Sequence, residues 1–327
     1  MRERVSDTAA LIDRIGDRDV ILSFSGGKDS TACGLWLQER GIPFRPLFLD
    51  TGWEHRDTYA HIEKLEALFG PVIRCRSEIQ PTPAYAAEIA EIEALLGWPS
   101  PFVRWMVHKA MFPSRKRRYC TQELKTRPFM LWADAHDAEI VNVIGIRRDE
   151  SEARASWPEW AGHPDAPSVE VFAPGILWTV ADVIEIHQRH GVEPCPLYLR
   201  WSSRLGCWPC INANREELRG LAQDLERTHI LRLVEALVKR IAHERGHNYA
   251  PDEDGNEGSP TFFQARIEEK GKAIRYPSWP IDKVLAWANR VPRRRAWQMD
   301  MFAAIPSEAG CARWGMCEHP AARRGVA

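Results

Sequence analysis

Residues 20–31 read VILSFSGGKDST, an apolar run that ends in glycines, a lysine, an aspartate and hydroxyl side chains. Glycine is favoured where the backbone turns tightly or approaches another group closely. Where a helix follows such a loop, backbone N–H groups and the positive helix N-terminus form an anion site. Lys28 adds a full charge, and Ser25, Ser30 and Thr31 add hydroxyl donors. The stretch therefore predicts a phosphate-binding loop.

This loop differs from the Walker A loop of P-loop NTPases. Gly26 and Gly27 precede Lys28, but Leu22 stands where that motif has its first glycine, and Asp29 replaces its serine or threonine. The alternative is a tight turn between a strand and a helix that binds no ligand. The six consecutive residues SGGKDS favour the anion-binding interpretation.

The elements that must position this loop follow an alternating pattern. Apolar runs predict strands at 19–25, 45–50, 71–76 and 138–146, and the stretches between them have apolar residues at helical spacing. Such alternation predicts an α/β fold, a Rossmann-like parallel sheet with helices on both faces. Ligands of these sheets bind beyond the carboxyl ends of the strands, where residues 25–30, 50–53 and 145–150 fall.

The pattern changes at about residue 195. Residues 195–210 are rich in turn formers, 214–246 read as a charged helix, and 251–260 read as an exposed loop. We therefore expect a nucleotide-binding α/β domain at 1–194 and a helical, cysteine-bearing region at 195–327.

The composition excludes several classes of protein. The chain has 327 residues, 44% of them hydrophobic and 27% charged, and a formal net charge of −1, which argues against a globally basic nucleic-acid binder. No apolar run approaches the ~20 residues of a membrane span, and the charged N-terminus lacks the apolar core of a signal peptide. We expect a cytoplasmic protein without membrane contact, whose eight cysteines serve thiol or metal chemistry rather than disulfides.

Five motifs in chain order resemble the PP-loop ATP pyrophosphatase superfamily and its phosphoadenosine phosphosulfate (PAPS) reductase branch. SGGKDS at 25–30 is similar to the superfamily signature. The motifs that resemble the branch are LDTGWEHRDT at 49–58, YCTQELK at 119–125, GIRRDESEAR at 145–154 and CPLYLRWSSRLGCWPC at 195–210. The resemblance implies an ATP-type nucleotide that is cleaved between its α- and β-phosphates. In ATP-using members a substrate oxygen is adenylated and sulfur then displaces AMP.

The resemblance also implies roles for individual residues. Lys28, Asp29 and Arg147 are the expected catalytic residues. The expected nucleotide-binding residues are Ser25, Gly26, Gly27, Lys28, Asp29, Ser30, Thr31, Asp50, Gly145 and Arg147.

Physical chemistry supports these roles. Lys28 and either Arg147 or Arg148 have the charge to neutralise a departing pyrophosphate. Asp29 and Asp50 are candidate ligands for Mg²⁺. The alternatives are that Asp29 caps the helix and that Asp50 opens a turn.

Three cysteines have spacings or settings suited to metal or redox chemistry. Cys207 and Cys210 are separated by two residues, so that both thiolates can reach one ion, one cluster or each other. Cys120 follows RKRRY, an electropositive setting that favours the thiolate. The resemblance implies that these three residues hold a [4Fe–4S] cluster.

The fourth ligand stays open. Thr121 stands where cluster-bearing reductases have the second cysteine of a pair, so that another cysteine must complete the set. Cys317 is favoured, and Cys311 and Cys195 are the alternatives. Structural zinc is an alternative to iron.

A basic segment at 104–127 surrounds Cys120. It contains eight Lys or Arg residues and one acid, Glu123, with Trp105, Phe112 and Tyr119 interleaved. Mixed basic and aromatic residues are typical of surfaces that bind a nucleic-acid backbone and stack its bases. The alternatives are a solvated surface, or a basic collar that serves only ATP and the cluster.

We therefore expect an ATP pyrophosphatase that adenylates a substrate for iron–sulfur-dependent sulfur transfer. The resemblance suggests nucleic acid as the acceptor, either DNA in phosphorothioation or tRNA in thiolation, and a partner such as a cysteine desulfurase as the sulfur donor. The alternative is a PAPS reductase that reduces a sulfonucleotide to sulfite. The intact SGGKDS loop favours ATP.

Overall fold

The computed structural model describes residues 8–249, 251, 258–268 and 273–290. Its strands are β1 (Asp19–Ser23), β2 (Arg45–Asp50), β3 (Ile73–Arg76), β4 (Ile140–Ile144), β5 (Trp160–His163), β6 (Ala166–Phe172), β7 (Phe263–Gln264) and β8 (Ser278–Trp279). Its helices are α1 (Thr8–Ile15), α2 (Lys28–Glu39), α3 (Arg56–Phe69), α4 (Ala86–Leu96), α5 (Pro101–Lys109), α6 (Tyr119–Thr121), α7 (Arg127–Asp134), α8 (Val180–Arg189), α9 (Pro196–Arg200), α10 (Arg215–Gln223), α11 (Leu225–Glu244) and α12 (Ile281–Asn289). A π-helical turn, Gln122–Thr126, joins α6 to α7.

The main sheet has six strands in the order β3-β2-β1-β4-β6-β5. The first five of these are parallel, and β5 pairs antiparallel with β6 at the edge. The predicted α/β fold with a parallel sheet is therefore confirmed, although the sequence pattern did not reveal β5 and β6. The chain order reverses between β1 and β4, which is where open α/β sheets bind ligands.

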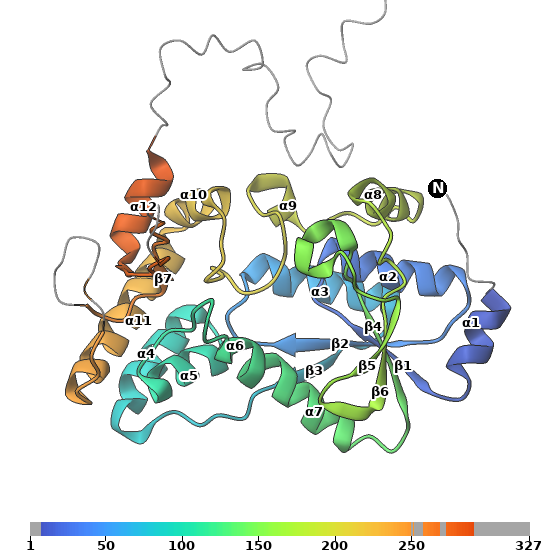
Figure 1. The fold of residues 1–327 in the computed structure, drawn as a ribbon, viewed down its shortest axis with the longest axis horizontal. Coiled ribbons are helices and arrows are strands. Elements are labelled where there is room, and N and C mark those ends of the chain that lie inside the picture. Colours follow the sequence, from blue (N-terminus) through green and yellow to red (C-terminus); the bar gives the residue numbers. More distant parts are fainter. Residues whose placement is uncertain (1–7, 250, 252–257, 269–272, 291–327) are drawn as a thin grey trace, which may run out of the picture.

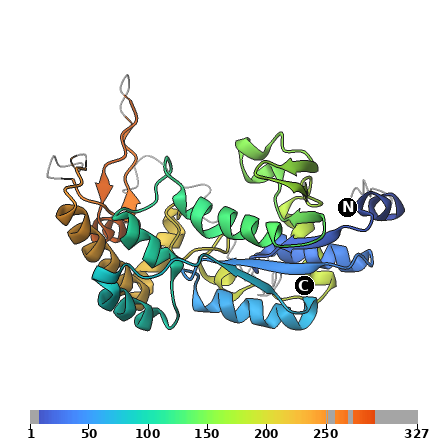
Figure 2. The same cartoon turned by 90° about the horizontal axis from the view of Figure 1, so that it is seen from below.

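Helices cover both faces of this sheet, as the sequence predicts (Figure 2). Val20 and Leu22 of β1 belong to the core formed with α1, α2, α3 and α8. Ile21, between them, belongs to the core on the other face, where α7 contributes Phe129 and Ala133. The side chains of β1 thus alternate between two apolar layers, as strands buried on both faces require.

A second, helical core lies beside the sheet (Figure 1). It contains residues of α4, α5, α10, α11 and α12 together with Trp53, three residues beyond the end of β2. The Trp53 and Phe102 rings meet edge to face with centroids 5.7 Å apart. This core draws on the chain both before and after residue 195, and the domain division at that residue stays a prediction.

The prediction of a single helix at 214–246 was wrong, because two helices, α10 and α11, occupy this stretch. Asp224 ends α10 and caps α11, because its Oδ1 accepts a hydrogen bond from the Arg227 N–H at 2.9 Å. Its Oδ2 accepts from the Trp208 indole at 3.0 Å. Within the described part of the chain, no helix has the length and apolar character needed to cross a membrane.

One buried histidine makes a testable contribution to stability. Burial lowers the pKa of His61 from 6.5 to about 4, and the charges of His187 and Lys64 act in the same direction. Between these pKa values the unfolded chain binds a proton that the folded chain does not. Stability should therefore be complete above about pH 6.5 and fall as the pH drops towards 4.

The variant His61→Gln should lack this pH dependence. Between pH 8 and pH 5 the free energy of unfolding of the wild type should fall by on the order of 2 kcal/mol more than that of the variant. Urea unfolding of both proteins across this range measures the difference. Parallel stability curves would contradict the assignment.

Candidate active site

The SGGKDS loop turns sharply between β1 and α2, and glycine is required at two places around it. Gly26 has a φ of +67°, in the left-handed region that side chains disfavour. A Cβ on Gly145, just beyond β4, would lie 2.6 Å from the Ser30 backbone nitrogen and 2.7 Å from the Asp29 carbonyl carbon. The loop after β4 therefore packs directly on the first turn of α2.

Hydroxyl groups organise the loop from inside. The Ser30 hydroxyl donates to the Gly27 carbonyl at 3.0 Å, and the Ser25 hydroxyl accepts from the Gly27 N–H at 3.3 Å. The Thr31 hydroxyl is buried and has no hydrogen-bond partner among the described residues. These contacts fix the backbone of the loop, and anion binding by the loop stays a prediction.

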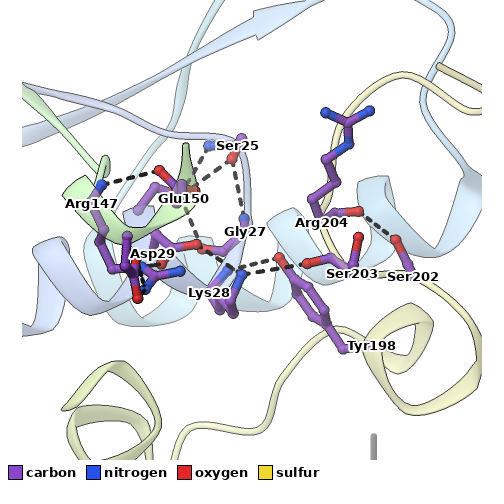
Figure 3. Close-up of polar contacts among 12 residues, drawn as sticks. Ser25, Gly27, Lys28, Asp29, Arg147, Glu150, Tyr198, Ser202, Ser203 and Arg204 are labelled. Carbon is purple, nitrogen blue, oxygen red and sulfur yellow. Dashed lines mark hydrogen bonds and ion pairs between the residues drawn. The ribbon is translucent and has the colours of Figure 1, made fainter. Parts of the chain in front are cut away.

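Lys28 begins α2 and lies between the loop and the segment around α9 (Figure 3). Its ammonium is 3.0 Å from Asp29 Oδ2 and donates to the Ser203 carbonyl at 3.4 Å. Its backbone N–H donates to the Tyr198 hydroxyl at 3.2 Å, and its carbonyl lies 2.8 Å from His187 Nε2. The lysine is thus fixed at both its backbone and its side chain.

Arg147, rather than Arg148, is the arginine at this site (Figure 3). Its guanidinium, 4% exposed as a residue, donates to Asp29 at 2.6 Å and to both oxygens of Asp149 at 2.5 and 2.6 Å. Arg148 instead donates to the Trp157 carbonyl. Asp29 therefore stands between two cations, Lys28 and Arg147.

Asp50 ends β2 as a buried residue whose two carboxylate oxygens already have protein partners. Oδ1 accepts from the Tyr59 hydroxyl at 2.7 Å and from the Gly52 N–H at 2.9 Å. Oδ2 accepts from Arg76, its neighbour in the register of β2 and β3. The turn-opening role considered for Asp50 is thus present, and Mg²⁺ binding by Asp29 and Asp50 stays a prediction.

Residues 202–205 separate the nucleotide loop from a cavity of about 130 Å³. The Ser203 carbonyl contacts Lys28 on the loop side, and residues 202, 204 and 205 line the cavity. It is lined by Lys125, Leu197, Trp201, Ser202, Arg204, Leu205, Gly206, Cys207, Trp208, Cys210 and Glu217. Cys207 and Cys210 thus share one cavity with the amine of Lys125. We call it the thiol cavity.

Charge links these thiols to a third one. Burial raises the pKa of the Cys207 thiol to about 12, with the Glu54 carboxylate adding to the effect and Lys125 opposing it. Burial likewise raises the pKa of the Cys120 thiol, and proximity to Cys210 raises it further. Burial alone would lower the pKa of Lys125, but these thiols and Glu54 outweigh it, so that the ammonium stays charged.

The sulfur donors and the cationic lysine suit a thiolate-bound metal or an anionic cluster. The described residues do not complete such a site, because no three of their His, Cys, Asp or Glu side chains are arranged to hold an ion. Cys317 and Cys311 lie outside the described residues. The cluster therefore stays a prediction, and no reaction step is assigned to it.

The other described cysteines are buried away from this cavity. Cys195 is fully buried, and its thiol faces the Asp57 carbonyl at 3.7 Å. Cys33 and Cys75 pack in the two cores of the sheet. Among the described cysteines, only Cys207 and Cys210 line the thiol cavity.

Residues 19–213 match the family of phosphoadenosine phosphosulfate reductase domains. The chain belongs to this family. An "uncharacterized 37.8 kDa protein in gpa 5'region" of Escherichia phage 186 is 31% identical over 340 residues, which span 91% of this chain and 96% of the phage protein. An uncharacterized protein of Methanocaldococcus jannaschii is 24% identical over 59% of this chain and 36% of its own length.

Among solved structures, the PAPS reductase of Candida auris in its phosphate complex aligns with a TM-score of 0.45 and 16% identity. The alignment covers 63% of this chain and 90% of the reductase. Membership of the family places the chain among PP-loop ATP pyrophosphatases and sulfonucleotide reductases, and its fold is consistent with an ATP-type ligand.

The sequence did not indicate a role for three residues of the site. Tyr198 and Lys125 lie within motifs shared with the family, but only the structure brings the Tyr198 hydroxyl to the Lys28 N–H and the Lys125 amine to the thiols. His187 lies on an amphipathic helix, and nothing in its spacing signals that α8 packs on α2.

The structure divides the basic segment 104–127 into paired and unpaired cations. Arg104 pairs with Glu93, while Lys109 and Arg127 both pair with Glu123. Residues 115–118 are exposed, and none of the described acidic side chains forms an ion pair with them.

The aromatic residues of this segment are not arranged at the surface for base stacking, as the sequence had suggested. Phe112 and Tyr119 are buried, and the Tyr119 hydroxyl donates to the Met111 carbonyl at 2.6 Å. The Trp105 indole donates to Ser77. The expectation that Phe112 and Tyr119 stack bases at the surface was therefore wrong, because both rings are buried and Phe112 belongs to the helical core.

The variant Gly145→Ala should damage the loop. Its methyl group would meet the backbone of Asp29 and Ser30, so that the first turn of α2 must shift, at a cost of about 1–3 kcal/mol. We expect weaker binding of ATP in calorimetry and a lower unfolding midpoint in urea. In the control Gly162→Ala, at the exposed edge strand, the new methyl group meets nothing within 4 Å. Equal ATP affinity of both variants would contradict the proposed close packing.

Proposed function

We propose that this family member is an ATP pyrophosphatase that activates an acceptor for sulfur transfer. In this reaction an acceptor oxygen attacks the α-phosphorus of ATP. The bond from that phosphorus to the oxygen bridging to the β-phosphate breaks, and pyrophosphate leaves. Hydrosulfide then attacks the acceptor and AMP departs with the oxygen.

The observation that carries the proposal is a shared wall between the nucleotide loop and the thiol cavity. Ser203 accepts from the Lys28 ammonium, and its neighbours Ser202 and Arg204 line the thiol cavity. Leu205 also lines that cavity, and its Cβ would lie 3.8 Å from a Cβ on Gly27. A nucleotide at the loop and sulfur at the thiols would therefore be separated by one layer of chain.

The charged groups of the loop suit departure of pyrophosphate. Lys28 and Arg147 both contact Asp29, which holds their charges close together. Preorganised cations act most strongly where negative charge develops during the reaction. We assign Lys28 to the phosphates directly, and Arg147 either to the phosphates or to the positioning of Asp29.

Cys120, Cys207, Cys210 and, outside the described residues, Cys317 are the ligands that we propose for a [4Fe–4S] centre. When bound, such a centre would hold sulfide or pass electrons. Nucleic acid, either DNA or tRNA, is the proposed acceptor, and a partner such as a cysteine desulfurase is the proposed source of sulfur. The exposed cations at 115–118, next to Cys120, support a polyanionic acceptor.

The variant Lys28→Ala should abolish release of pyrophosphate from ATP. Loss of one charge that stabilises the transition state costs about 3 kcal/mol, a hundredfold or more in turnover. A coupled pyrophosphate assay with DNA, tRNA or a sulfonucleotide present measures the rate. The exposed Lys239→Ala on α11 is the control and should keep full activity. Unchanged turnover of Lys28→Ala would show that the loop is not the catalytic site.

Protein purified without oxygen should be brown and contain roughly four irons per chain if the centre is of the [4Fe–4S] type. Cys207→Ser and Cys210→Ser should each lose most of this iron, because both thiols line the thiol cavity. Cys75→Ser, at a buried thiol in β3, should keep it. Iron analysis and absorbance near 400 nm provide the measurement. One tightly bound zinc and no iron would contradict the redox part of the proposal.

The family match also favours a second function, reduction of a sulfonucleotide to sulfite. The assay with three substrates separates the two functions. A reductase forms sulfite from the sulfonucleotide and releases no pyrophosphate from ATP, whereas the proposed enzyme releases pyrophosphate.

A further inference from the structure

A groove of about 700 Å³ lies away from the nucleotide loop, between the segment before α6 and the β7–β8 hairpin. Figure 2 shows these two segments side by side. One wall is lined by Met111, Phe112, Ser114, Arg115, Lys116 and Arg117, and the other includes Tyr249, Thr261, Gln264, Ile274, Arg275 and Tyr276. We call it the basic groove.

The basic groove carries positive charge on both walls. Arg115, Lys116 and Arg117 lie on one wall and Arg275 on the other, and no described Asp or Glu is among the lining residues. The first three have no acidic partner among the described residues, in contrast to Arg104 of the same segment. Several exposed cations on one wall of a concave surface attract a polyanion, and Arg275 adds positive charge on the other wall.

Two tyrosines add aromatic surface to this charge. The Lys116 ammonium lies 5.6 Å from the centroid of the Tyr276 ring, so that charge and ring adjoin. The Tyr249 hydroxyl donates to the Ala110 carbonyl at 2.9 Å, which fixes the ring at the wall. Both rings are half-buried and line the groove. These rings take the place of Phe112 and Tyr119, which are buried.

We propose that the basic groove binds single-stranded nucleic acid. Its phosphates would lie along Arg115, Lys116, Arg117 and Arg275, and its bases would stack on the two tyrosines. Stacking on rings inside a groove selects single strands, because the bases of a duplex are already stacked on each other. This inference rests on the proposed function for the class of acceptor, and it adds the strand state and the site.

The basic groove also leads towards the proposed chemistry. Along the chain, its cationic wall continues through Arg118 and Tyr119 to Cys120. The hydroxyls of Tyr249 and Tyr119 donate to the carbonyls of the adjacent residues Ala110 and Met111. A strand in the groove would therefore run beside the chain segment that carries Cys120.

Fluorescence anisotropy with the full chain tests the proposal without any need for catalysis. A labelled single-stranded DNA of 15 nucleotides, an RNA of the same sequence and the matching DNA duplex serve as probes over a range of salt. We expect either single strand to bind at least tenfold more tightly than the duplex. Equal affinity for duplex and single strands would overturn the proposal.

Tyr276 provides the sharpest test of stacking. Tyr276→Ala should weaken binding of the single strand about tenfold, whereas Tyr276→Phe, which keeps the ring, should bind like the wild type. Circular dichroism and thermal melting confirm that both variants are folded. Wild-type affinity of a folded Tyr276→Ala would refute the stacking role.

Replacing Arg115, Lys116 and Arg117 by Gln together should reduce the salt slope by about two, since each contact with a single strand contributes about 0.7. A charge-matched control replaces Arg232, Lys239 and Arg240 by Gln on α11, where none of them lines the groove. Equal slopes for the two triple variants would overturn the proposal.

Failure of this inference is distinguishable from failure of the proposed function. If pyrophosphate is released but no probe binds at low salt, the basic groove is refuted and the proposed chemistry stands. If single strands bind selectively but no pyrophosphate is released, the groove stands and the proposed chemistry fails. Competition by polyglutamate as strong as that by single-stranded DNA would show an unselective basic surface and refute the inference.

Discussion

The pairing of residues 53–54 with 207–209 joins the chain beyond β2 to the cysteine segment, and so the two parts of the site. The Trp208 N–H donates to the Trp53 carbonyl at 2.8 Å, and the Trp53 indole donates to the Pro209 carbonyl at 3.2 Å. Glu54 and Cys207 face each other in an isolated antiparallel bridge. Because Trp53 lies three residues beyond the end of β2, this contact fixes the cysteine segment to the edge of the sheet where the nucleotide loop lies.

This contact places charge in the interior. Burial raises the pKa of the Glu54 carboxyl, and Asp50 raises it further. The hydroxyls of Thr51 and Tyr59 donate to the carboxylate at 2.7 and 3.0 Å, and Lys125 provides a positive charge nearby. A buried charge is tolerated only when it is paired and hydrogen-bonded. Lys125 lies on the π-helical turn between α6 and α7. This turn therefore helps to place the positive charge that Glu54 requires.

Local patterns predicted the parts of the site that local structure determines. The alternation of strands and helices predicted the sheet. SGGKDS predicted the loop, whose observed internal hydrogen bonds join residues close in sequence. Contacts across long separations were not predictable. The Tyr198 hydroxyl meets Lys28 from 170 residues away, and no periodicity encodes that approach. The basic segment shows the same limit, because residue types could not distinguish cations paired with Glu93 or Glu123 from cations left exposed.

Exposed cations that lie apart from the paired ones give this near-neutral chain a local region of positive charge. With a formal net charge of −1, the protein has no overall attraction for a polyanion, so that any such attraction depends on where cations lack acidic partners. Residues 115–118 have no acidic partner in the part of the chain that the structure describes, and they lie at one end of the segment that continues through Cys120 to Lys125. Lys125 and Cys207 line the thiol cavity, whose wall residues 202–205 include the carbonyl that holds Lys28. The chain thus links the exposed cations to Lys125 at the thiol cavity, and residues 202–205 link that cavity to the nucleotide loop. An acceptor held by its phosphates at one end would lie on the route to the groups proposed to modify it.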